Sequence, residues 1–175
     1  MASFEVDGRY YELRPSTIKG AGLGLFSLQD ICRGTIIGKY EGRLFSKNKV
    51  ISSLREDYLY TNRFDEQIIP DFEKNPFAYA NDIVDVPMSL MFGEVRVGKK
   101  ECNLEWKEGM NEHIPDILVV ADVMKGDELF ISYGDGYWNW RIRNPKFRSK
   151  IVVGGDVLQQ YFIQKMRYDG ERECD

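Results

Sequence analysis

Histidine and cysteine are both scarce in this 175-residue sequence. The single histidine, His113, lies in the loop-like segment GMNEHIP, so a Ser-His-Asp or Cys-His mechanism would depend on that residue alone. Cys32, Cys102 and Cys174 are far apart and form no C-x-x-C pair. The sequence therefore predicts no metal cluster and needs no disulfide framework, and it disfavours much familiar hydrolase chemistry.

Long apolar runs are also missing. No segment approaches the roughly 18 apolar residues of a membrane span, and the first fifteen residues lack the layout of a secretory signal. The hydrophobic share of 43% and the charged share of 30% are ordinary for a globular protein. We expect one soluble, intracellular domain without a membrane partner. The net charge of −4 argues against a protein that mainly binds phosphate backbones.

Short apolar segments interrupted by Gly, Asp, Asn and Pro predict a mainly β fold. Residues 22–28 and 35–42 are typical of two strands. Residues 117–133 predict the clearest hairpin, with a Lys-Gly-Asp turn. A smaller hairpin is expected within residues 91–106, with Gly98 near its tip.

Two helices and one basic run complete the organisation. Residues 47–59 carry apolar side chains at helical spacing, and so do residues 156–168, where Asp156 can cap the helix and Gly170 ends it. Five cations lie within residues 141–150: Arg141, Arg143, Lys146, Arg148 and Lys150. This run predicts either a solvated face or a contact with nucleic acid or an acidic partner.

Two polar landmarks stand out. Residues 19–26 (KGAGLGLF) place glycines at alternate positions, which suits either a strand bulge or close approach of the backbone to a ligand. The segment lacks a complete phosphate-binding glycine motif. Asn81, Asp82 and Asn103 are residue types that build structured loops or contact ligands.

Aromatic residues gather after the segment GDELFISYG. Tyr133, Tyr137, Trp138 and Trp140 are denser than one corner of a core usually needs.

Taken in this order, KGAGLGLF, GKYEG, YAND with CNLEW, and GDELFISYG resemble the SET-domain family of protein lysine methyltransferases over residues 14–138. The resemblance implies several small sheets, few short helices and a knot-like C-terminal threading. Residues 1–140 would form the SET domain, with an inserted hairpin at about 86–101. Residues 141–175 would form a C-terminal segment whose helix, at about 156–168, closes the site.

The resemblance also implies roles for individual residues. S-adenosylmethionine would be bound by Lys19, Gly20, Ala21, Gly22, Asn81, Asp82 and Trp138. The catalytic residues would be Tyr133, beside the transferred methyl group, and Tyr40, in the lysine channel. Trp106, Ile131 and Tyr137 would line the substrate channel. The sequence departs from the family at Asp82, where the family usually has His, and it lacks a cysteine-rich zinc segment after the domain.

These residues suit methyl transfer to a neutral lysine amine. Desolvation and a nearby sulfonium charge lower an amine's pKa, so no strong base is required. The expected partner is a basic histone tail in the nucleus, with the run 141–150 as a nucleosome contact and Glu105 and Glu108 near the entrance. Two alternatives stay open at this stage: a non-histone protein substrate, or a catalytically weak domain that binds peptide or chromatin.

Overall fold

The structure is a computed structural model that describes residues 2–18, 21–46, 58–85, 98–99, 102–134 and 137. Within these residues the strands form four small antiparallel sheets. The described helical structure is limited to short turns, of which η2 (Pro76–Tyr79) is the clearest. The mainly β fold with several small sheets is therefore confirmed. In this part of the chain, no helix has the length and apolar character needed to cross a membrane.

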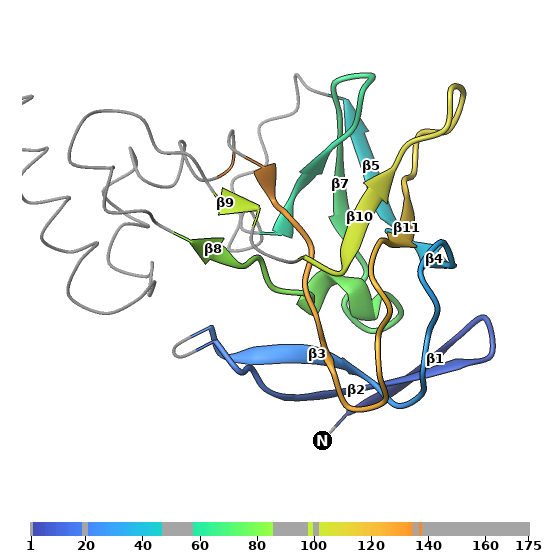
Figure 1. Cartoon of the computed structure of the whole chain (residues 1–175). Helices are drawn as coiled ribbons and strands as arrows, with labels where there is room; N and C mark the ends of the chain where they lie inside the picture. Colours follow the sequence, from blue (N-terminus) through green and yellow to red (C-terminus); the bar gives the residue numbers. More distant parts are fainter. Residues whose placement is uncertain are drawn as a thin grey trace, which may run out of the picture.

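The first sheet lies at the base of the molecule in Figure 1. Its strand order is β1 (Ser3–Val6), β2 (Arg9–Pro15), β3 (Leu23–Ser27) and β12 (Glu128–Leu129). Asp7 and Gly8 join β1 to β2 with φ angles of 48° and 73°, the left-handed backbone that a two-residue hairpin turn requires. The N-terminal sheet thus ends on a strand from a distant part of the sequence.

The remaining sheets are smaller. One has the order β10 (Leu104–Lys107), β11 (Asp116–Val119) and β4 (Ile36–Lys39). Another has the order β5 (Gly42–Ser46), β7 (Glu66–Pro70) and β6 (Tyr60–Thr61). The last pairs β8 (Val84–Asp85) with β9 (Gly98–Lys99).

The core lies where the sheets meet, and η2 fills part of it. The Asn75 side chain accepts a hydrogen bond from the Phe77 N–H at 3.1 Å, which begins η2. Phe77 is 3% exposed and packs edge-on against Tyr11, with ring centroids 5.7 Å apart. A Cβ at Gly38 would lie 2.7 Å from the Phe77 ring, so β4 can pass here only with glycine.

The segment 128–134 runs through the middle of the molecule, in orange in Figure 1. After β12 pairs with β3, the Ile131 N–H donates to the Asn81 carbonyl at 2.9 Å. The Leu104 N–H donates to the Phe130 carbonyl at 3.0 Å. Parallel bridges therefore place this segment against both the Asn81 and the Asn103 regions of the chain.

Two hairpin predictions were wrong. Residues 117–133 form no hairpin, because β11 pairs with β4 and β10 while β12 pairs with β3. A bridge between Val123 and Ile31 turns the chain from one sheet to the other. Gly98 lies in β9, paired with Asp85, and not at a hairpin tip.

Several predictions fall outside the described residues. These are the helix at 156–168, the C-terminal segment 141–175 and nearly all of the helix at 47–59. Between the paired β8 and β9, most of the inserted hairpin also lies outside them. The knot-like threading stays a prediction.

Candidate active site

Three aromatic rings pack together beside the ends of β4, β6 and β10. Tyr40 follows β4 and lies edge-on to Trp106 of β10, with ring centroids 5.0 Å apart. Tyr60 of β6 packs against both rings, with its ring centroid 4.5 Å from that of Trp106 and 6.1 Å from that of Tyr40. The Trp106 Nε1–H donates to the Ser132 carbonyl at 2.7 Å, so this cluster is fixed to the residue before Tyr133. The cluster is rigid because its polar atoms are bonded.

Tyr133 lies beside this cluster with both its backbone and its hydroxyl group bonded. The hydroxyl donates to the Ala80 carbonyl at 2.8 Å, and the ring packs edge-on against Tyr137 at 4.9 Å. Burial raises the pKa of Tyr133 well above its usual range, and negative charge on Tyr137, Tyr40 and Asp82 raises it further. Tyr133 is therefore a neutral phenol at physiological pH and no general base.

Asn81 connects Tyr133's surroundings to the glycine segment. Its Nδ2 donates to the Leu23 carbonyl at 2.9 Å, directly after Gly22. Gly22 has a φ of 82° and nothing within 4 Å of its Cβ position, so the backbone of this exposed turn is open to a ligand. Among the described residues, no hydrogen bond reaches the Asn81 Oδ1, which remains an available acceptor.

The Asp82 side chain bonds to the backbone of Tyr133, a contact that the sequence did not predict. It is 8% exposed, and its Oδ2 accepts a hydrogen bond from the Tyr133 N–H at 2.8 Å. Its Oδ1 lies 3.9 Å from the Cys102 Sγ. The carboxylate thus holds the backbone of Tyr133 directly and places a negative charge next to it.

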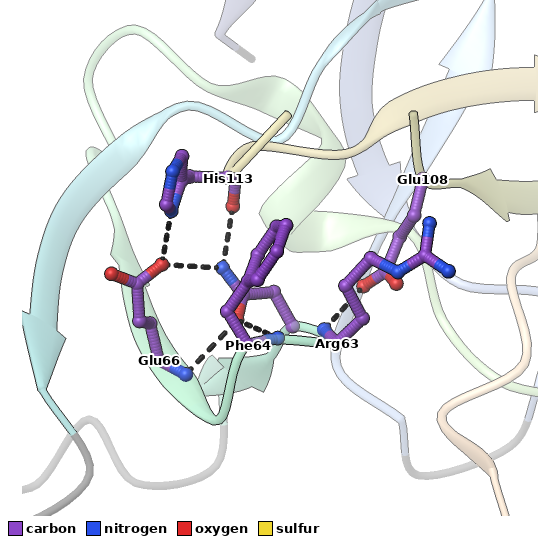
Figure 2. A network of polar contacts seen from close by, with 6 residues as sticks. Arg63, Phe64, Glu66, Glu108 and His113 are labelled. Carbon is purple, nitrogen blue, oxygen red and sulfur yellow. Dashed lines mark hydrogen bonds and ion pairs between the residues drawn. The ribbon is translucent and has the colours of Figure 1, made fainter. Parts of the chain in front are cut away.

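A polar network supports the outer side of the aromatic cluster (Figure 2). Glu108 accepts hydrogen bonds from the Tyr60 hydroxyl at 2.7 Å and from the Arg63 N–H at 3.1 Å. The Nδ2 of Asn62, a buried residue, donates to the His113 carbonyl at 2.8 Å and to the Glu66 carboxylate at 2.9 Å. The β6–β7 turn is therefore tied to the β10–β11 loop.

His113 completes this network at the surface. Its Nδ1 lies 2.5 Å from the Glu66 carboxylate, and its ring stacks on Phe64 with centroids 4.7 Å apart, as Figure 2 shows. The donated bond from Asn62, and then the contact with His113, lower the pKa of Glu66. The single histidine thus lies at the surface, in contact with Glu66 and Phe64.

Comparison with known proteins decides the family. The SET domain family pattern matches residues 22–134, about two thirds of the chain. The chain belongs to the SET-domain family. No curated protein sequence matches closely enough to count as a relative.

Solved structures agree on the fold. A candidate histone methyltransferase of Plasmodium falciparum matches with 20% identity and a TM-score of 0.50, covering 73% of this chain and 96% of that one. A humanized mutant of the Chaetomium thermophilum Polycomb Repressive Complex 2, bound to an inhibitor, matches with 23% identity and a TM-score of 0.54. That alignment covers 77% of this chain and 15% of the Chaetomium chain, so this SET domain corresponds to a small part of it.

The SET domain brings most of the predicted site residues into one region. The described ones that contact each other directly or through one intermediary are Gly22, Tyr40, Asn81, Asp82, Trp106, Ile131, Tyr133 and Tyr137. Ala21 precedes Gly22 in the exposed turn. Lys19, Gly20 and Trp138 lie outside the described residues. Among the residues described, no group of three or more His, Cys, Asp or Glu side chains is placed to hold a metal ion.

Tyr60 and Glu128 of this SET domain belong to the site but were not predicted from the sequence. Tyr60 carried no signal, since one tyrosine beside a short apolar run is ordinary. Glu128 did carry one, because it is an acid at the start of the apolar strand segment ELFI. An ionised side chain within such a segment is either exposed or bonded to several partners.

Proposed function

We propose that this SET domain is an S-adenosylmethionine-dependent protein lysine N-methyltransferase that acts on a basic histone tail in the nucleus. The observation that carries the proposal is the aromatic cluster of Tyr40, Tyr60 and Trp106, which the hydrogen bond from Trp106 to Ser132 joins to the segment that carries Tyr133. The same segment bonds to Asn81, which in turn bonds to Leu23 at the exposed Gly22 turn. This arrangement combines a cation-binding aromatic wall with an open backbone segment.

The residues present fit the cofactor. The exposed backbone at Ala21 and Gly22 offers donors and acceptors to its amino-acid end, and the Asn81 Oδ1 is available to accept from its ammonium group. When bound, S-adenosylmethionine supplies an electrophilic methyl group on a sulfonium. The anionic side chain of Asp82 beside Tyr133 favours cations at this place.

The chain's own residues would position the reacting amine and exclude water. The rings of Tyr40, Trp106 and Tyr133 would surround the lysine alkyl chain, and their desolvation of the ammonium group lowers its pKa toward the neutral form. The neutral Tyr133 phenol already donates its proton to Ala80, so its oxygen lone pairs can accept weak C–H···O contacts from a methyl group. Positioning would provide most of the rate acceleration.

A histone tail is proposed because the substrate must present a lysine to an acidic surface. Glu105 is exposed on β10, and Glu108 borders the aromatic cluster through Tyr60. Both would favour a peptide rich in Lys and Arg. The run from Arg141 to Lys150 is proposed as a nucleosome contact.

The test is transfer of labelled methyl groups from S-adenosylmethionine to core histones and nucleosomes. Tyr133→Phe should lower the rate about tenfold to a hundredfold, because the weak oxygen contacts and the anchor on Ala80 are lost together. Tyr10→Phe makes the same chemical change on a side chain that is 50% exposed on β2, and its rate should equal that of the wild type. Mass mapping of the products would identify the lysine.

Two results would contradict parts of the proposal. Cofactor binding without transfer to any histone would favour a non-histone substrate or a peptide-binding domain without catalysis. Equal rates for Tyr133→Phe and wild type would remove Tyr133 from the mechanism.

A further inference from the structure

The Glu128 side chain is a buried acid that the proposed mechanism does not use. It is 5% exposed at the start of β12, five residues before Tyr133. None of the ion pairs among the described residues includes it. A buried carboxylate without a cationic partner has to be stabilised by hydrogen bonds.

Both carboxylate oxygens of Glu128 accept two hydrogen bonds. The Oε1 accepts from the Ser16 hydroxyl at 2.6 Å and from the Asn81 Nδ2 at 3.3 Å. The Oε2 accepts from the Thr17 N–H at 2.7 Å and from the Thr17 hydroxyl at 2.5 Å. The Thr17 N–H and the Asn81 NH2 group can only donate, so each oxygen of Glu128 faces one partner that requires an acceptor.

These donors come from the two segments proposed to bind the cofactor. Ser16 and Thr17 lie just before the glycine turn, and the Ser16 hydroxyl also accepts from the Ile18 N–H at 3.0 Å. Asn81 lies on the other segment and donates to the Leu23 carbonyl after the turn. Glu128 therefore holds the glycine turn on its N-terminal side, while Asn81 holds it on the C-terminal side.

Gly24 of β3 leaves room for the Glu128 carboxylate. A Cβ at Gly24 would lie 2.1 Å from the Glu128 Oε1. The absence of a side chain at Gly24 therefore allows Glu128 to reach across β3 to Ser16 and Thr17. The Glu128 backbone is fixed as well, because its carbonyl accepts from the Asn103 Nδ2 at 2.9 Å.

We propose that Glu128 is a positioning residue that joins Ser16 and Thr17, just before the glycine turn, to Asn81 and so sets the affinity of the site for S-adenosylmethionine. The inference rests on the proposed function for its ligand. It adds a residue that contacts neither the cofactor nor the substrate but orders the turn that would bind the cofactor. The energetic reason is that an ordered turn has less conformational freedom to lose on binding.

The test compares wild type, Glu128→Gln and Glu5→Gln. Glu128→Gln keeps the size of the side chain but turns one oxygen into an NH2 group that faces donors. Glu5→Gln makes the same change on an exposed residue of β1. Binding of labelled S-adenosylmethionine is measured by equilibrium dialysis, and hydrogen exchange is followed at the Thr17 and Ile18 amides.

For Glu128→Gln we expect the cofactor Kd and KM to rise at least tenfold and the two amides to exchange faster. The KM for the protein substrate should stay within twofold, which general damage to the fold would not achieve. Glu5→Gln should match wild type. A cofactor Kd for Glu128→Gln within threefold of wild type overturns the inference.

A second variant and a second readout keep the two proposals separable. If Glu128→Gln does not fold, Thr17→Val removes one of the four donors and should raise the cofactor Kd three- to fivefold; an unchanged Kd overturns the inference. If wild type binds no cofactor, the proposed function fails and the affinity role of Glu128 fails with it. Exchange at the Thr17 amide then decides separately whether Glu128 orders the turn.

Discussion

Tyr11→Phe should make this protein more stable. Tyr11 lies on β2 with 0% exposure, and its phenolic oxygen has no hydrogen-bond partner among the described residues. A buried polar group without a partner costs about 1–3 kcal/mol. Phe keeps the ring and its edge-on contact with Phe77. We therefore expect the free energy of unfolding to rise by about 1 kcal/mol at pH 7, which is about 2–4 °C in Tm for a chain of this size.

The gain should increase at alkaline pH. Burial raises the pKa of Tyr11, with Arg9 lowering it and Asp7 raising it to smaller extents. A raised pKa means that the folded state keeps the phenol proton when the unfolded state has lost it. Ionisation of Tyr11 therefore leaves the free energy of unfolding of the wild type unchanged below about pH 10. Well above pH 10, it lowers that free energy by about 1.4 kcal/mol per pH unit. Phe has no proton to lose, so the difference between variant and wild type should widen by about 1 kcal/mol from pH 10 to 11, where the unfolded phenol is only partly ionised at the start.

The assay is denaturant unfolding followed by far-UV circular dichroism at pH 7, 9, 10 and 11. Tyr10→Phe, on the exposed face of the same strand, is the matched control and should change stability by less than about 0.5 kcal/mol. A Tyr11→Phe variant that is less stable than wild type at pH 7 would show that the hydroxyl has a partner. A constant difference between pH 10 and 11 would contradict the argument from the pKa.

Two further predictions concern the β4 strand and the surface network. Gly38→Ala should destabilise the fold by about 1–3 kcal/mol in denaturant unfolding, because the new Cβ would meet the Phe77 ring. Gly34→Ala, where the φ is 88° but the surroundings are open, separates backbone strain from this clash and should cost less. The lowered pKa of Glu66 means that its contacts stabilise the turn above about pH 4.5 and are lost as the pH falls through the folded pKa. Protection of the Glu66 amide against hydrogen exchange, taken relative to the intrinsic rate at each pH, should fall on acidification. In Glu66→Gln this protection should not change with pH, and an equal fall in that variant would show that another group is responsible.

The sequence was sufficient to predict β3 and β4 as strands but not to predict which strands pair. Residues 22–28 and 35–42 contain β3 and β4, because their alternation and their turn residues are local properties. The hairpin at 117–133 was wrong because strand pairing depends on tertiary contacts. Val123 bonds to Ile31, almost a hundred residues earlier, and this separates β11 from β12. A contact between residues so far apart in the sequence cannot be predicted from a local pattern.

Some site residues could likewise be predicted from the sequence, whereas the contacts that others make could not. Tyr40, Trp106 and Tyr133 were predicted from the family resemblance; the structure packs Tyr40 against Trp106 and bonds Trp106 to Ser132, the residue before Tyr133. The function of the Asp82 side chain could not be predicted, since its bond to the Tyr133 N–H depends on how two distant segments meet. The role of Glu128 depends on donors from distant segments, so the strand pattern of the apolar residues after it does not predict that role.

The central segment also has a consequence for the order of folding. The Ser16, Thr17 and Asn81 donors to Glu128 are 112, 111 and 47 residues away along the chain. Closing such long loops costs entropy that is repaid only when the last strand docks. During synthesis, the glycine turn is therefore made early but acquires its shape only after residue 128 has emerged. The proposed affinity for a cofactor would therefore arise late in folding, once nearly the whole described domain is in place.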